Sequence, residues 1–246
     1  MLPHTTPDQL KLLQPPVGWW PRLAGAVVRR WLALRYRTLS RRYDSLVLEE
    51  IDGVPLLVLS QVFNPVLLRT GSFMAQAIMN DRPEQSWSQK RVLDLGTGSG
   101  VGAVFAARRG AQVTAVDINP EAVRCAHINA LLNKFDQQIT VLQGDLFTSV
   151  QGQQFDLIFF NPPFYRGQPR HNLDHAWRGD DVFERFASQL AAMLTPTGEA
   201  RLVLSSDGNC DELLTLLQQQ NFSLGVIAHK NFINERVIMY QVQVNR

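Results

Sequence analysis

The feature that most constrains the fold is a regular alternation of apolar runs and helical segments from residue 90 onwards. Seven apolar runs predict strands at 91–96, 111–117, 138–145, 155–163, 200–206, 222–230 and 235–244. Helical segments at 101–109, 120–132, 180–194 and 209–220 separate most of them. This alternation predicts an α/β fold with a doubly wound, parallel sheet covered on both faces. The last two runs lie close together in the chain, so we expect an antiparallel edge there.

The residues before this alternation predict an extension of a different kind. Apolar residues at helical spacing predict a helix over 21–43, with arginines on much of the opposite side. A β-hairpin is expected next, because two apolar runs flank Asp52 and Gly53, a favourable tight-turn pair. We therefore divide the chain into an N-terminal extension at 1–62, made of the arginine-rich helix and the β-hairpin, and a larger domain at 63–246.

Charge and cysteine content narrow the class of protein. The net charge is only +2, so nothing in the total points to nucleic acid, although seven arginines crowd between residues 22 and 42. The two cysteines show no Cys/His spacing that predicts a metal site. The N-terminus lacks the layout of a signal peptide, and no apolar run approaches the ~20 residues that span a bilayer. We expect a soluble cytoplasmic protein without a membrane partner.

The stretch DLGTGSG lies where the first strand of the alternation meets its helix. Gly96, Gly98 and Gly100 remove side chains, so the backbone can approach a ligand closely. Asp117 ends the second strand about 20 residues later, where an acid can accept both hydroxyls of a ribose. A turn of this kind predicts a nucleotide or nucleoside ligand.

Two ligands fit such a turn, a dinucleotide and S-adenosylmethionine. A dinucleotide usually needs the spacing G-x-G-x-x-G, whereas the spacing here is G-x-G-x-G. Asp94 would repel a pyrophosphate but would suit a ligand with an ammonium and a sulfonium group. Asp145 ends the third strand, where it can accept a hydrogen bond from an adenine amino group. Acids at three successive strand ends therefore favour S-adenosylmethionine.

The stretch FFNPPF ends the fourth strand at the same edge of the sheet. The side-chain oxygen of Asn161 can accept a hydrogen bond from an NH2 group. Pro162 and Pro163 have no N–H and offer only carbonyl acceptors, and the ring of Phe164 can lie against a planar group. This array predicts that Asn161 and Pro162 hold both hydrogens of a planar NH2 group in line with the methyl donor. Catalysis would then come from positioning and preorganised dipoles without a dedicated base.

These motifs resemble the class I methyltransferases that carry an NPPY signature, above all the release-factor glutamine methyltransferases. VLDLGTGSG resembles their donor loop, VDINPEA their ribose-binding strand end, GDLF their adenine site and FNPPF their amide-binding loop. The stretch at 62–73 is similar in position to a loop that closes over donor and substrate in that family. The resemblance covers roughly 63–246 and implies a Rossmann-like methyltransferase sheet.

The resemblance also implies roles for individual residues. The implied catalytic residues are Asn161, Pro162, Pro163 and Phe164. The implied S-adenosylmethionine site consists of Asp94, Gly96, Thr97, Gly98, Gly100, Asp117, Ile118, Asp145, Leu146 and Asn161. The sequence departs from the family in having Phe164 for the tyrosine of NPPY, and Asp180 where a glycine follows the segment AWRG.

The resemblance implies an S-adenosylmethionine-dependent N-methyltransferase whose acceptor is most readily a protein glutamine amide on a release-factor-like partner. The alternative acceptor is an exocyclic base amine, guanine N2 or adenine N6, in RNA or DNA, because it too presents an NH2 on a planar group. The N-terminal arginines could contact RNA phosphates, or they could form a solvated helix face. A small-molecule acceptor and a catalytically idle, donor-binding scaffold are the other readings.

Overall fold

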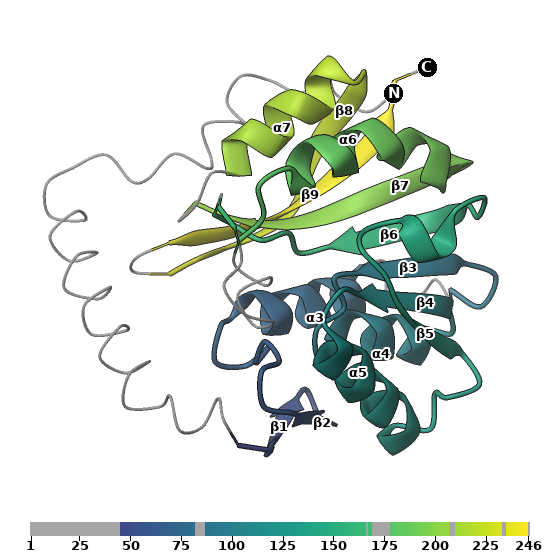
Figure 1. Cartoon of the computed structure of the whole chain (residues 1–246), viewed down its shortest axis with the longest axis vertical. Helices are drawn as coiled ribbons and strands as arrows, with labels where there is room; N and C mark the ends of the chain where they lie inside the picture. The colour runs from purple at the N-terminus through teal and green to yellow at the C-terminus, as the bar shows by residue number, and fades with distance from the viewer. Residues whose placement is uncertain are drawn as a thin grey trace, which may run out of the picture.

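A twisted sheet of seven strands forms the centre of the protein (Figure 1). The computed structural model describes residues 45–81, 87–165, 167–168, 178–206, 210–232 and 235–245. The strands of this sheet are β3 (Arg91–Leu95), β4 (Gln112–Asp117), β5 (Ile139–Gln143), β6 (Phe155–Phe160), β7 (Leu194–Ser205), β8 (Phe222–Asn231) and β9 (Arg236–Val244). They lie in the order β5-β4-β3-β6-β7-β9-β8.

The pairing within the sheet confirms the predicted doubly wound α/β class. The strands from β3 to β7 pair in parallel, whereas β9 runs antiparallel to both β7 and β8. The chain therefore builds β3, β4 and β5 outwards in one direction and then returns to place β6 on the other side of β3. In a sheet of this type, ligands bind outside the carboxyl ends of the strands at such a reversal.

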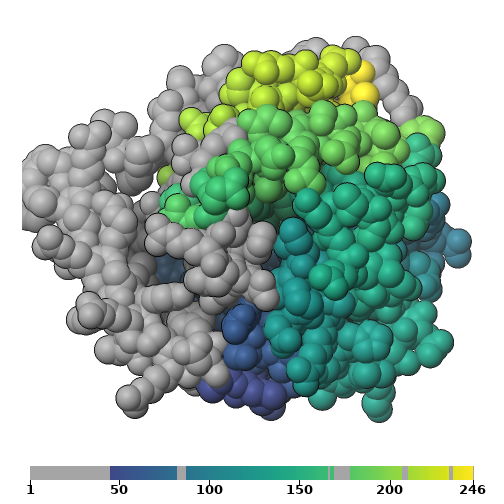
Figure 2. Space-filling model, in the orientation of Figure 1, coloured from purple at the N-terminus to yellow at the C-terminus, as the bar shows by residue number. Residues whose placement is uncertain are grey.

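Helices cover both faces of the sheet, as the sequence predicts. They are α3 (Thr70–Asn80), α4 (Val101–Arg108), α5 (Pro120–Leu132), α6 (Val182–Met193) and α7 (Cys210–Gln219), with a short 3-10 helix at Thr148–Val150. Strand β6 shows why two layers form, because its residues alternate between two cores: Ile158 and Phe160 pack with α6 and α7, whereas Leu157 and Phe159 pack with α3 and α4. In the space-filling view the green atoms of the C-terminal half adjoin the teal atoms of the preceding segments on the right of the face shown (Figure 2).

Helix α5 begins at the predicted residue, Pro120. The side-chain oxygen of Asn119 accepts a hydrogen bond of 3.0 Å from the backbone N–H of Glu121, and Pro120 occupies the first helical position. A cap of this kind contributes about 1 kcal/mol to helix stability. The Nδ2 of Asn119 also donates to the carbonyl of Gln61 at 2.8 Å. The start of α5 is therefore tied to the segment that precedes α3.

The structure corrects the prediction at the start of β7. The sequence predicts a helix over 180–194, a turn at 195–199 and a strand only from residue 200. Instead, α6 covers Val182–Met193 and β7 begins directly at Leu194. Leu194 pairs with Phe155, and the register then shifts before Glu199 pairs with Leu157. Turn residues such as those in TPTG can be accommodated as a bulge within a strand, which a local pattern does not distinguish from the end of a strand.

The predicted hairpin is present as β1 (Val47–Ile51) and β2 (Val54–Val58). Asp52 and Gly53 have positive φ angles of 47° and 77°, as a tight hairpin turn requires. The buried Asn129 of α5 accepts from the N–H of Leu57 and donates to the carbonyls of Leu57 and Ser99, at 2.7, 2.7 and 2.8 Å. Hydrogen bonds through Asn129 thus connect the hairpin to the glycine turn. The predicted domain boundary at residue 62 stays a proposal.

The predicted arginine-rich helix at 21–43 lies outside the described residues. Among the residues that the structure describes, no helix is long and apolar enough to cross a membrane.

Candidate active site

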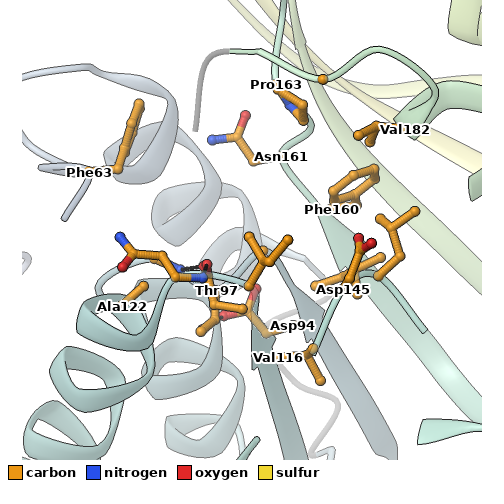
Figure 3. Close-up of a pocket in the computed structure, with 18 of the residues that line it drawn as sticks. Phe63, Asp94, Thr97, Val116, Ala122, Asp145, Phe160, Asn161, Pro163 and Val182 are labelled. Carbon is orange, nitrogen blue, oxygen red and sulfur yellow. Dashed lines mark hydrogen bonds between the residues drawn. The ribbon is translucent and has the colours of Figure 1, made fainter. Parts of the chain in front are cut away.

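A cavity of about 250 Å³ opens at the carboxyl ends of β3, β4, β5 and β6 (Figure 3). Most of the site residues predicted from the sequence line it, namely Asp94, Gly96, Thr97, Gly98, Asp117, Ile118, Asp145, Leu146, Asn161 and Pro163. Three predicted residues, Gly100, Pro162 and Phe164, are not part of its lining. The two motifs DLGTGSG and FFNPPF thus contribute to one cavity although 58 residues separate them.

The glycine turn has two kinds of glycine. Gly96 and Gly98 have φ angles of 65° and 56° and line the cavity, so their backbone is open to a ligand. Gly100, at φ 81°, faces helix α5 instead. A Cβ added there would lie 2.9 Å from the Cα of Ala126. Gly100 therefore lets α4 and α5 approach each other, and its assignment to direct donor contact stays a prediction.

Asp94 is buried beneath the turn, with only 2% of its surface exposed. Its Oδ2 accepts hydrogen bonds from the hydroxyl of Thr97 at 2.5 Å and from the N–H of Ala103 at 2.8 Å. The carboxylate fits against α4 because residue 102 is glycine, since a Cβ there would lie 2.5 Å from Oδ1. Burial raises the pKa of Asp94 to about 7, with a smaller contribution from Asp117, while the bonds from Thr97 and Ala103 act against the rise.

This pKa predicts that a cationic ligand binds more weakly as the pH falls. Above pH 7 the Asp94 carboxylate is ionised and favours a ligand that carries an ammonium group. Below pH 7 the Asp94 carboxyl is protonated and must lose its proton before it can favour the ammonium group. The Kd of the ligand should therefore rise by up to about tenfold for each unit by which the pH falls. Calorimetry with S-adenosylhomocysteine between pH 6 and 8, in two buffers, should also detect proton release at pH 6.5.

The matched control is Asp94→Asn, which keeps the shape but cannot ionise. Any pH dependence that belongs to the ligand's own amine persists in this variant and can be subtracted. A Kd with the same pH dependence in both proteins would show that the Asp94 carboxylate does not titrate against the ligand.

Asp117 connects the glycine turn to the start of α5. Its Oδ2 accepts from the N–H of Gly98 at 2.8 Å, and its Oδ1 accepts from the N–H of Asn119 at 2.9 Å. A carboxylate offers about four lone-pair sites, so each oxygen can accept a second hydrogen bond from a ligand hydroxyl. The carboxylate is therefore already oriented at the wall of the cavity by two backbone N–H groups.

Asp145 is held by a residue that the sequence did not point to. Its Oδ2 lies 2.7 Å from the Nη2 of Arg185, which also contacts Asp181 at 3.4 Å. The hydrogen bond from the guanidinium to Asp145 raises the pKa of Arg185. About two fifths of the Asp145 side chain is exposed, so this pair contributes modestly to stability and chiefly fixes the direction of the carboxylate.

Asn161 carries an unused acceptor. Its Nδ2 donates to the hydroxyl of Thr70 at 3.2 Å. Its Oδ1 is buried, and no described residue gives it a hydrogen bond. A buried amide oxygen without a donor costs about 1–3 kcal/mol, so its presence at a cavity wall marks a place where a donor is expected to bind. The structure therefore offers one hydrogen-bond acceptor at the end of β6, beside the glycine turn.

The aromatic surface near this acceptor differs from the predicted one. Phe164 is 8% exposed and packs into the core on the side of α6 and α7, and Pro162 is also buried. Instead, Phe63 lines the cavity, and Figure 3 shows its ring on the same side of the cavity as Asn161. The roles of Phe164 and of the Pro162 carbonyl stay predictions, and Phe63 is an aromatic residue that lines the cavity.

The contributors to the site that sequence reasoning missed include Phe63, Thr70 and Arg185. The family resemblance implies a loop over the site at 62–73, but no local pattern distinguishes Phe63 or Thr70 within it. Arg185 lies on the first turns of an amphipathic helix, where an arginine is ordinarily a solvated residue. Only the tertiary arrangement of α3 and α6 around the cavity identifies them.

The donor set fits S-adenosylmethionine better than a dinucleotide. The cavity combines a buried acid beneath the turn, a two-oxygen acceptor at Asp117, a further acid at Asp145 and apolar walls from Ile118 and Leu146. These groups suit an ammonium, a ribose and an adenine. None of the acids would favour a pyrophosphate.

Comparison with known proteins decides the family. The profile of the family described as "Methyltransferase small domain" matches residues 57–231. The chain belongs to this family. It is an S-adenosylmethionine-dependent methyltransferase, and the solved structures with the same fold include complexes with S-adenosylmethionine and with adenosine.

Similar proteins differ in the acceptor that their names state. A protein of Methanocaldococcus jannaschii, provisionally named a protein N5-glutamine methyltransferase, is 29% identical over 188 residues, which cover 73% of this chain and 90% of that protein. A tRNA1(Val) (adenine(37)-N6)-methyltransferase of Porphyromonas gingivalis is 32% identical over 126 residues, covering 47% of this chain and 49% of that one. The chain thus spans about half the length of the tRNA-modifying relative.

A solved structure shows the same fold. It is the Thermus thermophilus 16S rRNA N2 G1207 methyltransferase in complex with S-adenosylmethionine and guanosine, with a TM-score of 0.59 and 24% identity. The match covers 79% of this chain and 49% of that chain.

Proposed function

We propose that this methyltransferase modifies a nitrogen of a planar NH2 group, and that its acceptor is a glutamine side-chain amide of a protein. The observation that carries the proposal is the buried, unpartnered Oδ1 of Asn161 at the wall of the cavity. An oxygen in this position accepts a hydrogen bond from an N–H group and would repel an acceptor oxygen that carries no hydrogen.

The chemistry requires orientation more than proton removal. The nitrogen of an amide is a weak nucleophile because its lone pair is delocalised. A hydrogen bond to Asn161 Oδ1 orients the nitrogen and stabilises the positive charge that develops on it as the new N–C bond forms. The surplus proton then leaves to solvent. Phe63 supplies a flat apolar surface in the same cavity, which restricts a planar acceptor to one orientation.

S-adenosylmethionine supplies an electrophilic methyl group on a sulfonium, and its transfer leaves a neutral thioether. We assign the hydroxyls of its ribose to Asp117, its adenine to Asp145, Ile118 and Leu146, and its ammonium end to the region of Asp94. Gly96, Thr97 and Gly98 provide the backbone beneath it. These assignments follow from the cavity lining and from the hydrogen-bonding capacity of each group.

Two observations favour a protein acceptor. The glutamine methyltransferase relative is matched over most of its length, whereas the tRNA relative is matched over about half. In addition, the residues that the structure describes include 17 aspartates and glutamates but only 12 lysines and arginines. An excess of acids over the described part of the chain is unfavourable for binding nucleic acid. A release-factor-like partner and a cytoplasmic location belong to the same proposal.

A nucleic-acid acceptor is the second candidate, and the first 44 residues favour it. They contain eight lysines and arginines and only two aspartates. Such a segment could supply the phosphate contacts that the rest of the chain lacks. In that case the exocyclic amine of guanine or adenine would donate to Asn161 Oδ1 in the same way as a glutamine amide.

A pair of peptides tests the proposal. Radiolabelled S-adenosylmethionine is incubated with the protein and a peptide that presents a Gly-Gly-Gln loop, and in parallel with the Gly-Gly-Asn version. We expect label only in the glutamine peptide, because the shorter asparagine cannot bring its amide to the same place. An extract assay with nuclease or protease treatment identifies the labelled class directly. Label that nuclease removes and protease leaves would assign the acceptor to nucleic acid.

A further inference from the structure

Thr70 is the residue that accepts the hydrogen bond from the side-chain nitrogen of Asn161. The Nδ2 of Asn161 donates to Thr70 Oγ1 at 3.2 Å, and this is the contact that the structure gives to the amide group of that side chain. Thr70 itself is 2% exposed and is the first residue of α3, 91 residues before Asn161 in the chain. No signal in FFNPPF reveals this partner.

The contact matters because an amide has two ends of opposite character. With Nδ2 toward Thr70, the oxygen is the end of the amide that no described residue bonds, and it can accept from an NH2 group. If the amide were rotated by half a turn, its NH2 group would replace the oxygen. Two hydrogen-bond donors, the Asn161 NH2 and the NH2 of the methyl acceptor, would then face each other. A threonine hydroxyl can also donate, so an acceptor NH2 that binds the oxygen reinforces the orientation seen here, in which Thr70 accepts from Nδ2.

The position of Thr70 is fixed by its own surroundings. Pro65 caps the start of α3 from the other side, since its carbonyl accepts from the N–H and the hydroxyl of Ser72, both at 3.0 Å. A Cβ at Gly71 would lie 2.4 Å from the Cβ of Pro65, so residue 71 must be glycine for this approach. The buried Asn64 accepts from the N–H groups of Val66 and Leu67 and closes the loop.

The residue before Thr70 is anchored to the loop between β8 and β9. Arg69 has a φ of 62°, an unusual backbone angle for an arginine. Its guanidinium lies 4.7 Å from the ring centroid of Phe232 and 3.8 Å from the carboxylate of Glu235. These contacts hold the backbone before α3 in a conformation that a free chain rarely adopts. Thr70 Oγ1 then lies within hydrogen-bond distance of Asn161 at the end of β6.

We propose that Thr70 is a positioning residue of this enzyme, which holds the Asn161 amide with its oxygen toward the methyl acceptor. The proposal rests on the proposed function, because it assumes that the acceptor presents an NH2 group. It assigns no contact between Thr70 and the acceptor or the donor.

Substitution of Thr70 by valine tests the role, because valine keeps the shape and removes the hydroxyl. We expect kcat on the Gly-Gly-Gln peptide to fall about tenfold, while the Kd for S-adenosylhomocysteine changes less than twofold. Thr70→Ser should restore most of the activity. Thr215→Val, an exposed threonine-to-valine change on α7, is the matched control and should have no effect.

A double-mutant cycle separates positioning from a general structural role. Thr70→Val should have almost no further effect on the residual activity of Asn161→Ala, because its target is gone. If the two substitutions instead multiply, Thr70 acts independently of Asn161 and the proposal is wrong.

A spectroscopic readout keeps this test independent of the acceptor. The side-chain NH2 signals of Asn161, assigned by their absence from Asn161→Ala, report its hydrogen bond without turnover. In the protein bound to S-adenosylhomocysteine, Thr70→Val should shift these signals and speed their exchange with solvent at least severalfold. Unchanged signals would overturn the positioning role. Changed signals without any peptide methylation would retain it and reject only the glutamine acceptor.

Discussion

Replacement of Asn161 by alanine should lower kcat by about 10² to 10³-fold, a loss typical of removing one preorganised polar group from a transition state. The variant lacks the only side-chain oxygen that the described structure leaves unpartnered at the end of β6. Binding of S-adenosylhomocysteine should weaken by less than about fivefold, because the groups assigned to the donor lie mostly on β3, β4 and β5. Single-turnover transfer of labelled methyl to the acceptor measures the first effect, and calorimetry the second.

Asn161→Asp is the informative companion variant. It keeps an acceptor oxygen of the same reach, so it should retain more activity than alanine. Asn133→Ala removes an amide outside the cavity lining and serves as a matched control for asparagine-to-alanine substitution. Alanine at 161 with near-normal kcat would show that this side chain does not orient the nitrogen.

Replacement of Asp117 by alanine should weaken donor binding by at least about 100-fold. The change removes two acceptor sites for a ribose and also releases the N–H groups of Gly98 and Asn119, which the carboxylate now orders. Two lost hydrogen bonds to a charged group, at about 1.5–3 kcal/mol each, account for a loss of this size. Calorimetric titration with S-adenosylhomocysteine measures it directly.

The fold should survive this substitution, since Asp117 lies at the end of a strand and only partly buried. Asp136→Ala removes an exposed acid between α5 and β5 and should leave the Kd for S-adenosylhomocysteine unchanged. The thermal midpoint of both variants without ligand provides the check on folding. If Asp117→Ala bound the donor within about threefold of the unmodified protein, the ribose assignment would fail.

The sequence predicted the sheet and the place of the site because both depend on repeated patterns. Alternating strands and helices determine a doubly wound sheet, and the carboxyl ends of its strands then gather DLGTGSG, Asp117, Asp145 and FFNPPF on one edge. The start of α5 could also be predicted, since Asn119 and Pro120 act locally.

The remaining features depend on contacts between distant segments, which no local pattern contains. Thr70 meets Asn161 across 91 residues, and Arg185 meets Asp145 across 40. Gly102 is an exception, because it lies inside a helix, where glycine costs about 1 kcal/mol relative to alanine. Such a glycine indicates a close neighbour, and here that neighbour is the carboxylate of Asp94.

The most direct measurement is a crystal structure of the protein with S-adenosylhomocysteine and the Gly-Gly-Gln peptide bound together. We predict that the glutamine Nε2 lies within hydrogen-bond distance of Asn161 Oδ1 and faces the donor's sulfur, with Thr70 still accepting from Asn161 Nδ2. A glutamine amide bound elsewhere, or an Asn161 oxygen directed away from it in the occupied cavity, would contradict the account.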